Sequence, residues 1–142
     1  MTNSMTIIVP PIVQVLTWGC ILAFVHIFAA VNAKTRQYGT KWNIGPRDGE
    51  LPPLNPVAGR LARAQANFFE TFPVFIAAML VASASGEIMS HNVTLGGWLW
   101  LGGRVAYLPL YAFGVPVVRS VAWAVSLVGI VLVLIPALRL LF

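Results

Sequence analysis

Charged residues are scarce in this chain. Only 9% of its 142 residues are Asp, Glu, Lys or Arg, and just four of those are acidic. A soluble domain usually carries about 25% charged residues. Here 58% of the residues are hydrophobic and the mean hydropathy is +0.83. These values exclude an ordinary soluble domain and indicate an integral membrane protein, whose apolar segments leave no room for a separate soluble domain.

Residues that bind metals or form disulfides are also few. The chain has two histidines and one cysteine, and we see no clustered His, Cys and carboxylate ligands, so no metal is expected. Cys20 lies inside the first apolar segment and cannot form an internal disulfide. We interpret it as a small packed residue rather than a nucleophile. His26 lies in the same segment, either as a hydrogen-bonded packing residue or as a proton relay or ligand contact.

Basic residues outnumber acidic ones, which gives a formal net charge of +5 and a pI near 10.2. They stand at the ends of apolar segments, so we attribute them to membrane orientation and expect no nucleic acid as a partner. Most of them cluster around the first loop, and Arg119 follows the last connection. The positive-inside rule therefore predicts that these connections are cytoplasmic and that both termini lie on the outer side of the membrane.

The hydrophobic pattern predicts one all-α domain over residues 1–142, built as an antiparallel bundle of four transmembrane helices. The helices are expected at about 12–33, 56–84, 93–113 and 116–135, since roughly 20 apolar residues cross a bilayer. Residues 37–55 are rich in Gly and Pro and predict a cytoplasmic loop. Asn55-Pro56 is typical of a helix start. Gly114 and Pro116 allow only a tight hairpin between the last two helices.

Two helices carry polar stripes at helical spacing. Arg63, Asn67 and Glu70 stand at i, i+4 and i+7 of the second helix. The third helix carries a matching stripe, which comprises Arg104, Tyr107 and Tyr111. Polar groups in hydrocarbon are costly, so both stripes must face protein, water or a polar ligand.

The two stripes match in depth, because residues at equal depth in antiparallel helices have a constant sum of residue numbers. By this rule Glu70 lies level with Arg104, and we predict a deep structural ion pair between them. The same rule puts Asn67 level with Tyr107 and Arg63 level with Tyr111.

The hairpin returns Arg119 to the depth of Tyr111. Arg119 falls in the first turn of the fourth helix, where unpaired backbone N–H groups and the helix dipole favour an anion. This convergence predicts a site near the cytoplasmic face for an oxyanion, a carboxylate or a thiolate.

At these residues the sequence resembles the MAPEG family, the membrane-associated proteins of eicosanoid and glutathione metabolism. The likeness rests on Arg63-Ala-Gln-Ala-Asn67-x-x-Glu70-x-x-Pro73, Arg104-x-x-Tyr107-x-x-x-Tyr111 and Pro116-x-x-Arg119-Ser120. The loop Gly45-Pro46-Arg47-Asp48 resembles the bacterial branch, which implies a bacterial inner membrane.

The resemblance implies a homotrimer that binds glutathione, as co-substrate, between neighbouring subunits. It implies that Arg119 stabilises the glutathione thiolate, with Tyr111 or Ser120 assisting. Further residues would hold glutathione: Lys34, Arg63, Gln65, Asn67, Glu70, Tyr107 and Tyr111. A hydrophobic substrate would enter from the membrane lipid and glutathione from the cytoplasm.

The expected function is therefore that of a glutathione-binding membrane enzyme, a transferase acting on hydrophobic electrophiles and/or a peroxidase reducing lipid hydroperoxides. The alternative is a non-catalytic protein of the same fold that binds lipid or a protein partner. A third reading, a small proton-coupled exporter, requires an unpaired carboxylate in the membrane, and the predicted partner of Glu70 argues against it.

Overall fold

A computed structural model describes residues 9–141, and every regular element in that range is helical. The helices are α1 (Pro11–Tyr38), α2 (Thr40–Ile44), α3 (Pro56–Ala84), α4 (His91–Phe113) and α5 (Pro116–Leu138). The bounds of α3 agree with the predicted ones. Helix α1 runs five residues further than predicted, because Lys and Arg end a hydrophobic span without ending a helix. Gly39, at φ 89°, ends it instead.

The predicted loop at 37–55 needs one correction, because it contains the short helix α2. Its five residues, Thr40–Ile44, include neither Gly nor Pro, and they lie between Gly39 and Gly45. The rest of the segment is tied back to α1. Gln37 Nε2 donates to the Pro53 carbonyl at 2.9 Å, and Tyr38 Oη donates to the Pro52 carbonyl at 2.6 Å.

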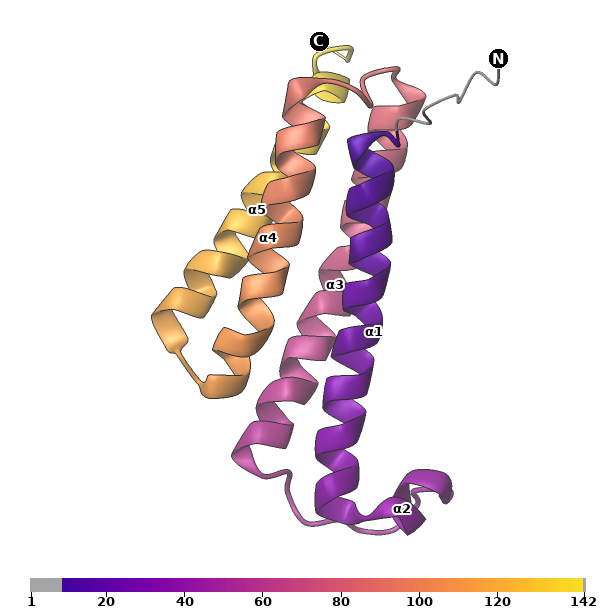
Figure 1. The fold of residues 1–142 in the computed structure, drawn as a ribbon, viewed down its shortest axis with the longest axis vertical. Helices are drawn as coiled ribbons and strands as arrows, with labels where there is room; N and C mark the ends of the chain where they lie inside the picture. Colours follow the sequence, from indigo (N-terminus) through magenta and orange to yellow (C-terminus); the bar gives the residue numbers. More distant parts are fainter. Residues whose placement is uncertain (1–8, 142) are drawn as a thin grey trace, which may run out of the picture.

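The four long helices form a bundle in which α1 lies along α3, and α4 and α5 form a hairpin beside them (Figure 1). The described chain begins and ends at the same end of the bundle. At the other end, α1 and α3 extend past the turn between α4 and α5 (Figure 1).

Local capping explains where these helices start and stop. The Asn55 side chain accepts a hydrogen bond from the Ala58 N–H at 2.9 Å, and Pro56 occupies the first turn of α3. Gly114 ends α4 in the left-handed conformation, at φ 76°. Its freedom at positive φ is what allows the α4–α5 turn to be so short.

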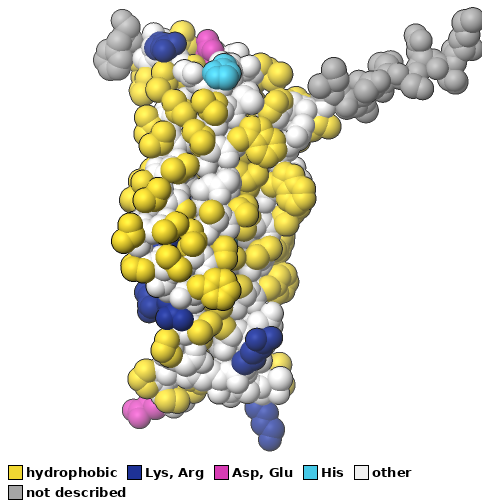
Figure 2. Space-filling view, turned by 60° about the vertical axis from the view of Figure 1, so that its left-hand side comes forward, with side chains coloured by type: hydrophobic (Ala, Val, Ile, Leu, Met, Phe, Trp, Pro, Cys, Tyr) yellow, Lys and Arg dark blue, Asp and Glu magenta, His cyan; other side chains and the backbone are white. Residues whose placement is uncertain are grey.

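Within the described residues, α1, α3 and α5 are each long and apolar enough to cross a membrane. Helix α4 is long enough, with 23 residues, but falls short of the other three in hydropathy. Figure 2 shows hydrophobic side chains covering the middle of one face, with charged side chains above and below them. The chain is therefore an integral membrane protein.

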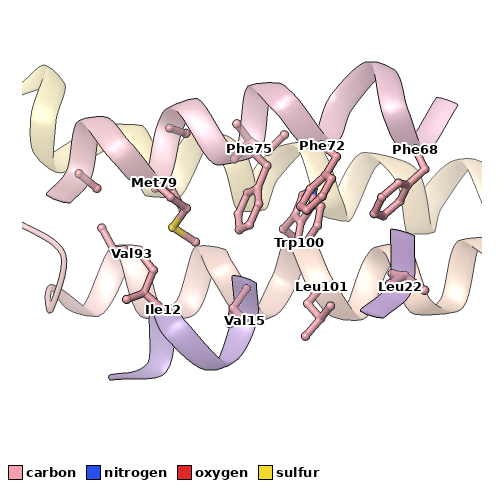
Figure 3. Packing of buried hydrophobic residues seen from close by; sticks show 14 residues of the cluster. Ile12, Val15, Leu22, Phe68, Phe72, Phe75, Met79, Val93, Trp100 and Leu101 are labelled. Atoms are coloured by element: carbon pink, nitrogen blue, oxygen red, sulfur yellow. The ribbon is translucent and has the colours of Figure 1, made fainter. Parts of the chain in front are cut away.

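A stack of aromatic rings forms the centre of the core. Phe68, Phe72 and Phe75 project from one side of α3 towards Trp100 on α4 (Figure 3). The rings of Phe75 and Trp100 lie nearly parallel, with centroids 3.8 Å apart, and that of Phe72 is 5.5 Å from Trp100. Burying these rings fixes the rotation of α3 about its own axis, because this side of the helix must face α4.

Glycines bring α4 and α5 into backbone contact. A Cβ atom added at Gly96 would lie 2.5 Å from the carbonyl oxygen of Gly129, and one at Gly103 would lie 2.6 Å from that of Ala122. Helix α4 carries two pairs of adjacent glycines, Gly96-Gly97 and Gly102-Gly103, and one glycine of each pair forms this close helix contact. Gly102, by contrast, faces open space.

Gly96→Ala is expected to lower the free energy of unfolding by about 1–3 kcal/mol, because a methyl group there overlaps the α5 backbone. Gly102→Ala adds the same atoms on an open face, so it should be neutral or stabilising by up to about 1 kcal/mol. Thermal unfolding of the purified protein in detergent, followed by circular dichroism, measures both. Equal stabilities of the two variants would contradict the backbone contact.

Candidate functional site

Two neighbouring hollows open on the side of the bundle where α3 faces the α4–α5 hairpin. The inner one has a volume of about 320 Å³ and is lined by Asn67, Tyr107, Arg119, Ser120 and Trp123. The outer one, close to the hairpin turn, measures about 260 Å³ and is lined by Arg60, Arg63, Tyr111, Gly114, Pro116 and Arg119. Arg119 lines both hollows, which we therefore treat as one groove.

The groove is cationic. Three guanidinium groups line it, those of Arg60, Arg63 and Arg119, and no acidic residue does. Helix α5 begins at its rim with Pro116, and no side chain caps the first turn. The free N–H groups of that turn add partial positive charge, so the groove is electrostatically suited to an anion.

Arg119 and two tyrosines form a compact cluster in this groove. The guanidinium carbon of Arg119 lies 4.3 Å from the centre of the Tyr111 ring, and the rings of Tyr111 and Tyr107 are 5.2 Å apart. Arg119 thus lies at the depth of Tyr111, as the hairpin spacing predicts. Stacking on an aromatic face holds the guanidinium in place while its N–H groups remain available at its edge.

Arg104 lies beside this cluster, with its guanidinium carbon 5.6 Å from the centre of the Tyr107 ring. It is fully buried, and it does not pair with Glu70. Its Nη1 donates to the Asn67 Oδ1 at 2.8 Å, whereas Glu70 is exposed. The predicted Glu70–Arg104 ion pair is therefore wrong within this chain. Glu70 lies two positions after Phe68 and two before Phe72, so a helix turns it to the side of α3 opposite the aromatic core.

The predicted site residues divide into two groups. The groove gathers six of them: Arg63, Asn67, Tyr107, Tyr111, Arg119 and Ser120. Lys34, Gln65 and Glu70 line neither hollow and lie partly or fully exposed on the surface of the chain. The Ser120 hydroxyl donates to the Pro116 carbonyl at 3.0 Å, so its proton is already engaged.

Besides the hairpin residues Gly114 and Pro116, two groove residues are missing from the sequence prediction, Arg60 and Trp123. Each could be found from helical spacing, because Arg60 lies three positions before Arg63 and Trp123 four positions after Arg119. Arg60 Nε donates to the Ala112 carbonyl at 2.9 Å, so this side chain joins α3 to the C-terminal end of α4. It contributes both charge and structure to the groove.

Neither residue singled out in the first apolar segment lines the groove. His26 is buried and stacks on Phe68 with ring centroids 4.5 Å apart, so it packs as expected but lacks, within the described part of the chain, the hydrogen bond expected of it. Its ring nitrogens have no hydrogen-bond partner among residues 9–141. Cys20 is exposed on the outer face of α1, so the expectation that it is packed is wrong.

This fold and groove define a class of protein: an integral membrane protein of bundled helices with a cationic, tyrosine-lined groove on its flank. The sequence model of the MAPEG family matches residues 15–139, and the chain belongs to that family. A comparison with curated proteins finds no match, and neither does one with solved structures.

Arg60→Met should lower the free energy of unfolding by about 1–2 kcal/mol, because it removes a hydrogen bond and a cation from the C-terminal end of α4. Lys41→Met, at an exposed position on α2, serves as the control and should leave stability unchanged. Denaturation of both variants in detergent measures the effect. A wild-type stability in Arg60→Met would show that the bond to Ala112 contributes nothing.

Proposed function

We propose that this protein is a glutathione-binding membrane enzyme that transfers glutathione to hydrophobic electrophiles and/or reduces lipid hydroperoxides. The observation that carries the proposal is the position of Arg119, which lines both hollows and stacks on Tyr111. Membership of the MAPEG family supports glutathione as the ligand. No metal takes part in the proposed reaction.

The groove offers different chemistry along its length. In the outer hollow, Arg60 and Arg63 suit the carboxylates of glutathione. In the inner hollow, Arg119 suits the cysteine thiolate, beside Tyr107 and Ser120. Each unit by which Arg119 lowers the pKa of that thiol requires about 1.4 kcal/mol of preferential stabilisation of the thiolate.

The proposed reaction begins with the bound thiolate acting as a nucleophile. With an electrophile, its sulfur forms a bond to carbon while a leaving group departs with its electron pair, or the electron pair moves into a conjugated acceptor. With a lipid hydroperoxide, the sulfur attacks the terminal oxygen and the O–O bond breaks, so that the lipid alkoxide leaves, takes up a proton and departs as the alcohol. The sulfur is left as a sulfenic acid, and a second glutathione displaces water from it to form the disulfide. Arg119 stabilises the negative charge on sulfur before attack.

Four membrane crossings fit the path of the chain. Helices α3 and α5 are both apolar enough to span and run in the same direction (Figure 1). The chain must therefore return across the bilayer between them, and α4 is the segment that runs back. Its lower hydropathy is consistent with the buried Arg104 and the groove residues that it carries.

We further propose that the active assembly is a homotrimer whose subunits complete the groove. The support is the exposed side of α3, where Arg63 and Glu70 lie. Glu70 stands 14 residues from the start and 14 from the end of α3, so it lies near mid-membrane, where lipid would not tolerate a charge. A neighbouring protomer would cover this side and bring Lys34 and Gln65 towards the ligand.

The orientation of the chain follows from its basic residues. The end of the bundle that carries the groove also carries the basic segment 34–63, which favours the cytoplasmic side of a bacterial inner membrane, with both termini periplasmic. Because Glu70 does not pair with Arg104 among the described residues, pairing no longer argues against an exporter. The argument against an exporter now rests on membership of the MAPEG family.

Arg119→Ala is expected to reduce the rate of glutathione conjugation about 10²–10³-fold, as removal of one donor to a developing or bound anion does. Binding should weaken less, since the outer hollow remains. The pH at which turnover is half-maximal should rise, because a thiol without its cation ionises at higher pH. Titration calorimetry and a spectrophotometric assay with a hydrophobic electrophile, both in detergent, measure these quantities.

Arg139→Ala, at the opposite end of the bundle, is the matched control and should behave as the wild type. A folded wild type that binds no glutathione would exclude the enzyme and leave the non-catalytic, lipid- or partner-binding alternative. Unchanged turnover in Arg119→Ala would exclude the role given to that residue.

A further inference from the structure

The Asn67 side chain lies between a buried cation and the groove. On one side, its Oδ1 accepts from the Nη1 of Arg104 at 2.8 Å, and Arg104 is 0% exposed. On the other side, Asn67 lines the inner hollow together with Tyr107 and Arg119. One end of this amide is therefore committed to Arg104, and the other is available to a ligand.

The hydrogen-bonding chemistry of the Arg104 guanidinium and the Asn67 amide decides which end of the amide faces Arg104. A guanidinium has only donors, whereas an amide has a donor end and an acceptor end. The amide must therefore turn its oxygen to Arg104, and its NH₂ group is left for the groove. The orientation of the amide therefore follows from its contact with a group that only donates. It does not depend on telling the amide oxygen from the amide nitrogen by position.

Arg104 has little alternative to this pairing. Its Nε and Nη2 have no hydrogen-bond acceptor among the described residues, and both atoms are buried. The Asn67 oxygen is thus the single side-chain acceptor that residues 9–141 offer to this guanidinium. Turning the amide around would bring its NH₂ group against a buried cation and leave the cation with no acceptor at all, which is strongly disfavoured.

We propose that Arg104 is a positioning residue that fixes the Asn67 amide with only N–H donors facing the groove, so that the ligand presents an acceptor oxygen there. The chemical class of that ligand group is a carbonyl or carboxylate oxygen. The statement about the ligand rests on the proposed function, whereas the orientation of the amide rests on the Arg104–Asn67 contact alone.

Asn67→Asp and Asn67→Leu separate the two halves of the proposal, because both replacements are close to Asn in size. Aspartate keeps an acceptor for Arg104 but, when ionised, has no donor for the groove. Leucine keeps neither group. Ligand-free thermal unfolding in detergent should show Asn67→Asp at or above the melting temperature of the wild type, and Asn67→Leu clearly below it.

Glutathione binding by calorimetry then tests the donor. Asn67→Asp, although fully folded, should bind at least about tenfold more weakly, since it replaces a donor by a negative oxygen facing the ligand acceptor. Arg104→Lys still donates to the Asn67 oxygen and should bind within about threefold of the wild type. If Arg104 served stability alone, the folded Asn67→Asp variant, which still holds Arg104, would bind glutathione as the wild type does.

Two results would overturn the proposal. If Asn67→Asp is as unstable as Asn67→Leu, the acceptor at position 67 does not hold Arg104. If Asn67→Asp binds glutathione as well as the wild type, the groove does not use a donor at this position. If the wild type itself binds no glutathione, the proposed function fails, and the ligand-free stabilities alone then support or overturn the orientation of the amide.

Discussion

The stacking of three phenylalanines of α3 on Trp100 is the contact on which the rest of the structure depends. It buries four aromatic rings at the centre of the core and leaves α3 only one rotation about its axis. The position of each polar residue of α3 around the helix axis, relative to that stack, then decides which groups the residue contacts. Asn67 falls at the flank, next to Arg104 and the groove, and Glu70 falls on the far side.

The hairpin supplies the remaining geometry. Backbone contact through Gly96 and Gly103 holds α4 against α5, and Gly114 makes the turn between them short. A short turn leaves few residues between Tyr111 and Arg119, which is why the cation returns onto the ring. The chemistry of the groove is in this sense a consequence of three glycines, of which Gly96 and Gly103 lie outside the groove.

The depth of each residue along its helix could be predicted from the sequence. The direction in which its side chain points around the helix axis could not. Counting residues gave the bounds of α3, the hairpin and the level at which Arg119 meets Tyr111. The same counting placed Glu70 level with Arg104 and was misleading, because two residues at one depth can face opposite ways. What decides the direction is which of Phe68, Phe69 and Phe72 are buried together, and a segment that is apolar on most sides does not reveal that.

A second limit is that Lys34, Gln65 and Glu70 do not line the groove of their own chain, so the sequence could name them without showing what they contact.

The unequal lengths of the two helix pairs have a consequence for access. Since α1 and α3 extend beyond the α4–α5 turn (Figure 1), the tip of the hairpin is set back from the end of the molecule. Phe113 and Val117, at that tip, are 82% and 72% exposed, as suits side chains that rest among lipid headgroups and upper acyl chains. In the enzyme that we propose, the mouth of the groove is a side entrance at the interface, where a water-soluble peptide can descend along α3 and a hydrophobic molecule can arrive laterally at the same arginine. Two reactants with opposite solubility can meet there without either one leaving its own phase.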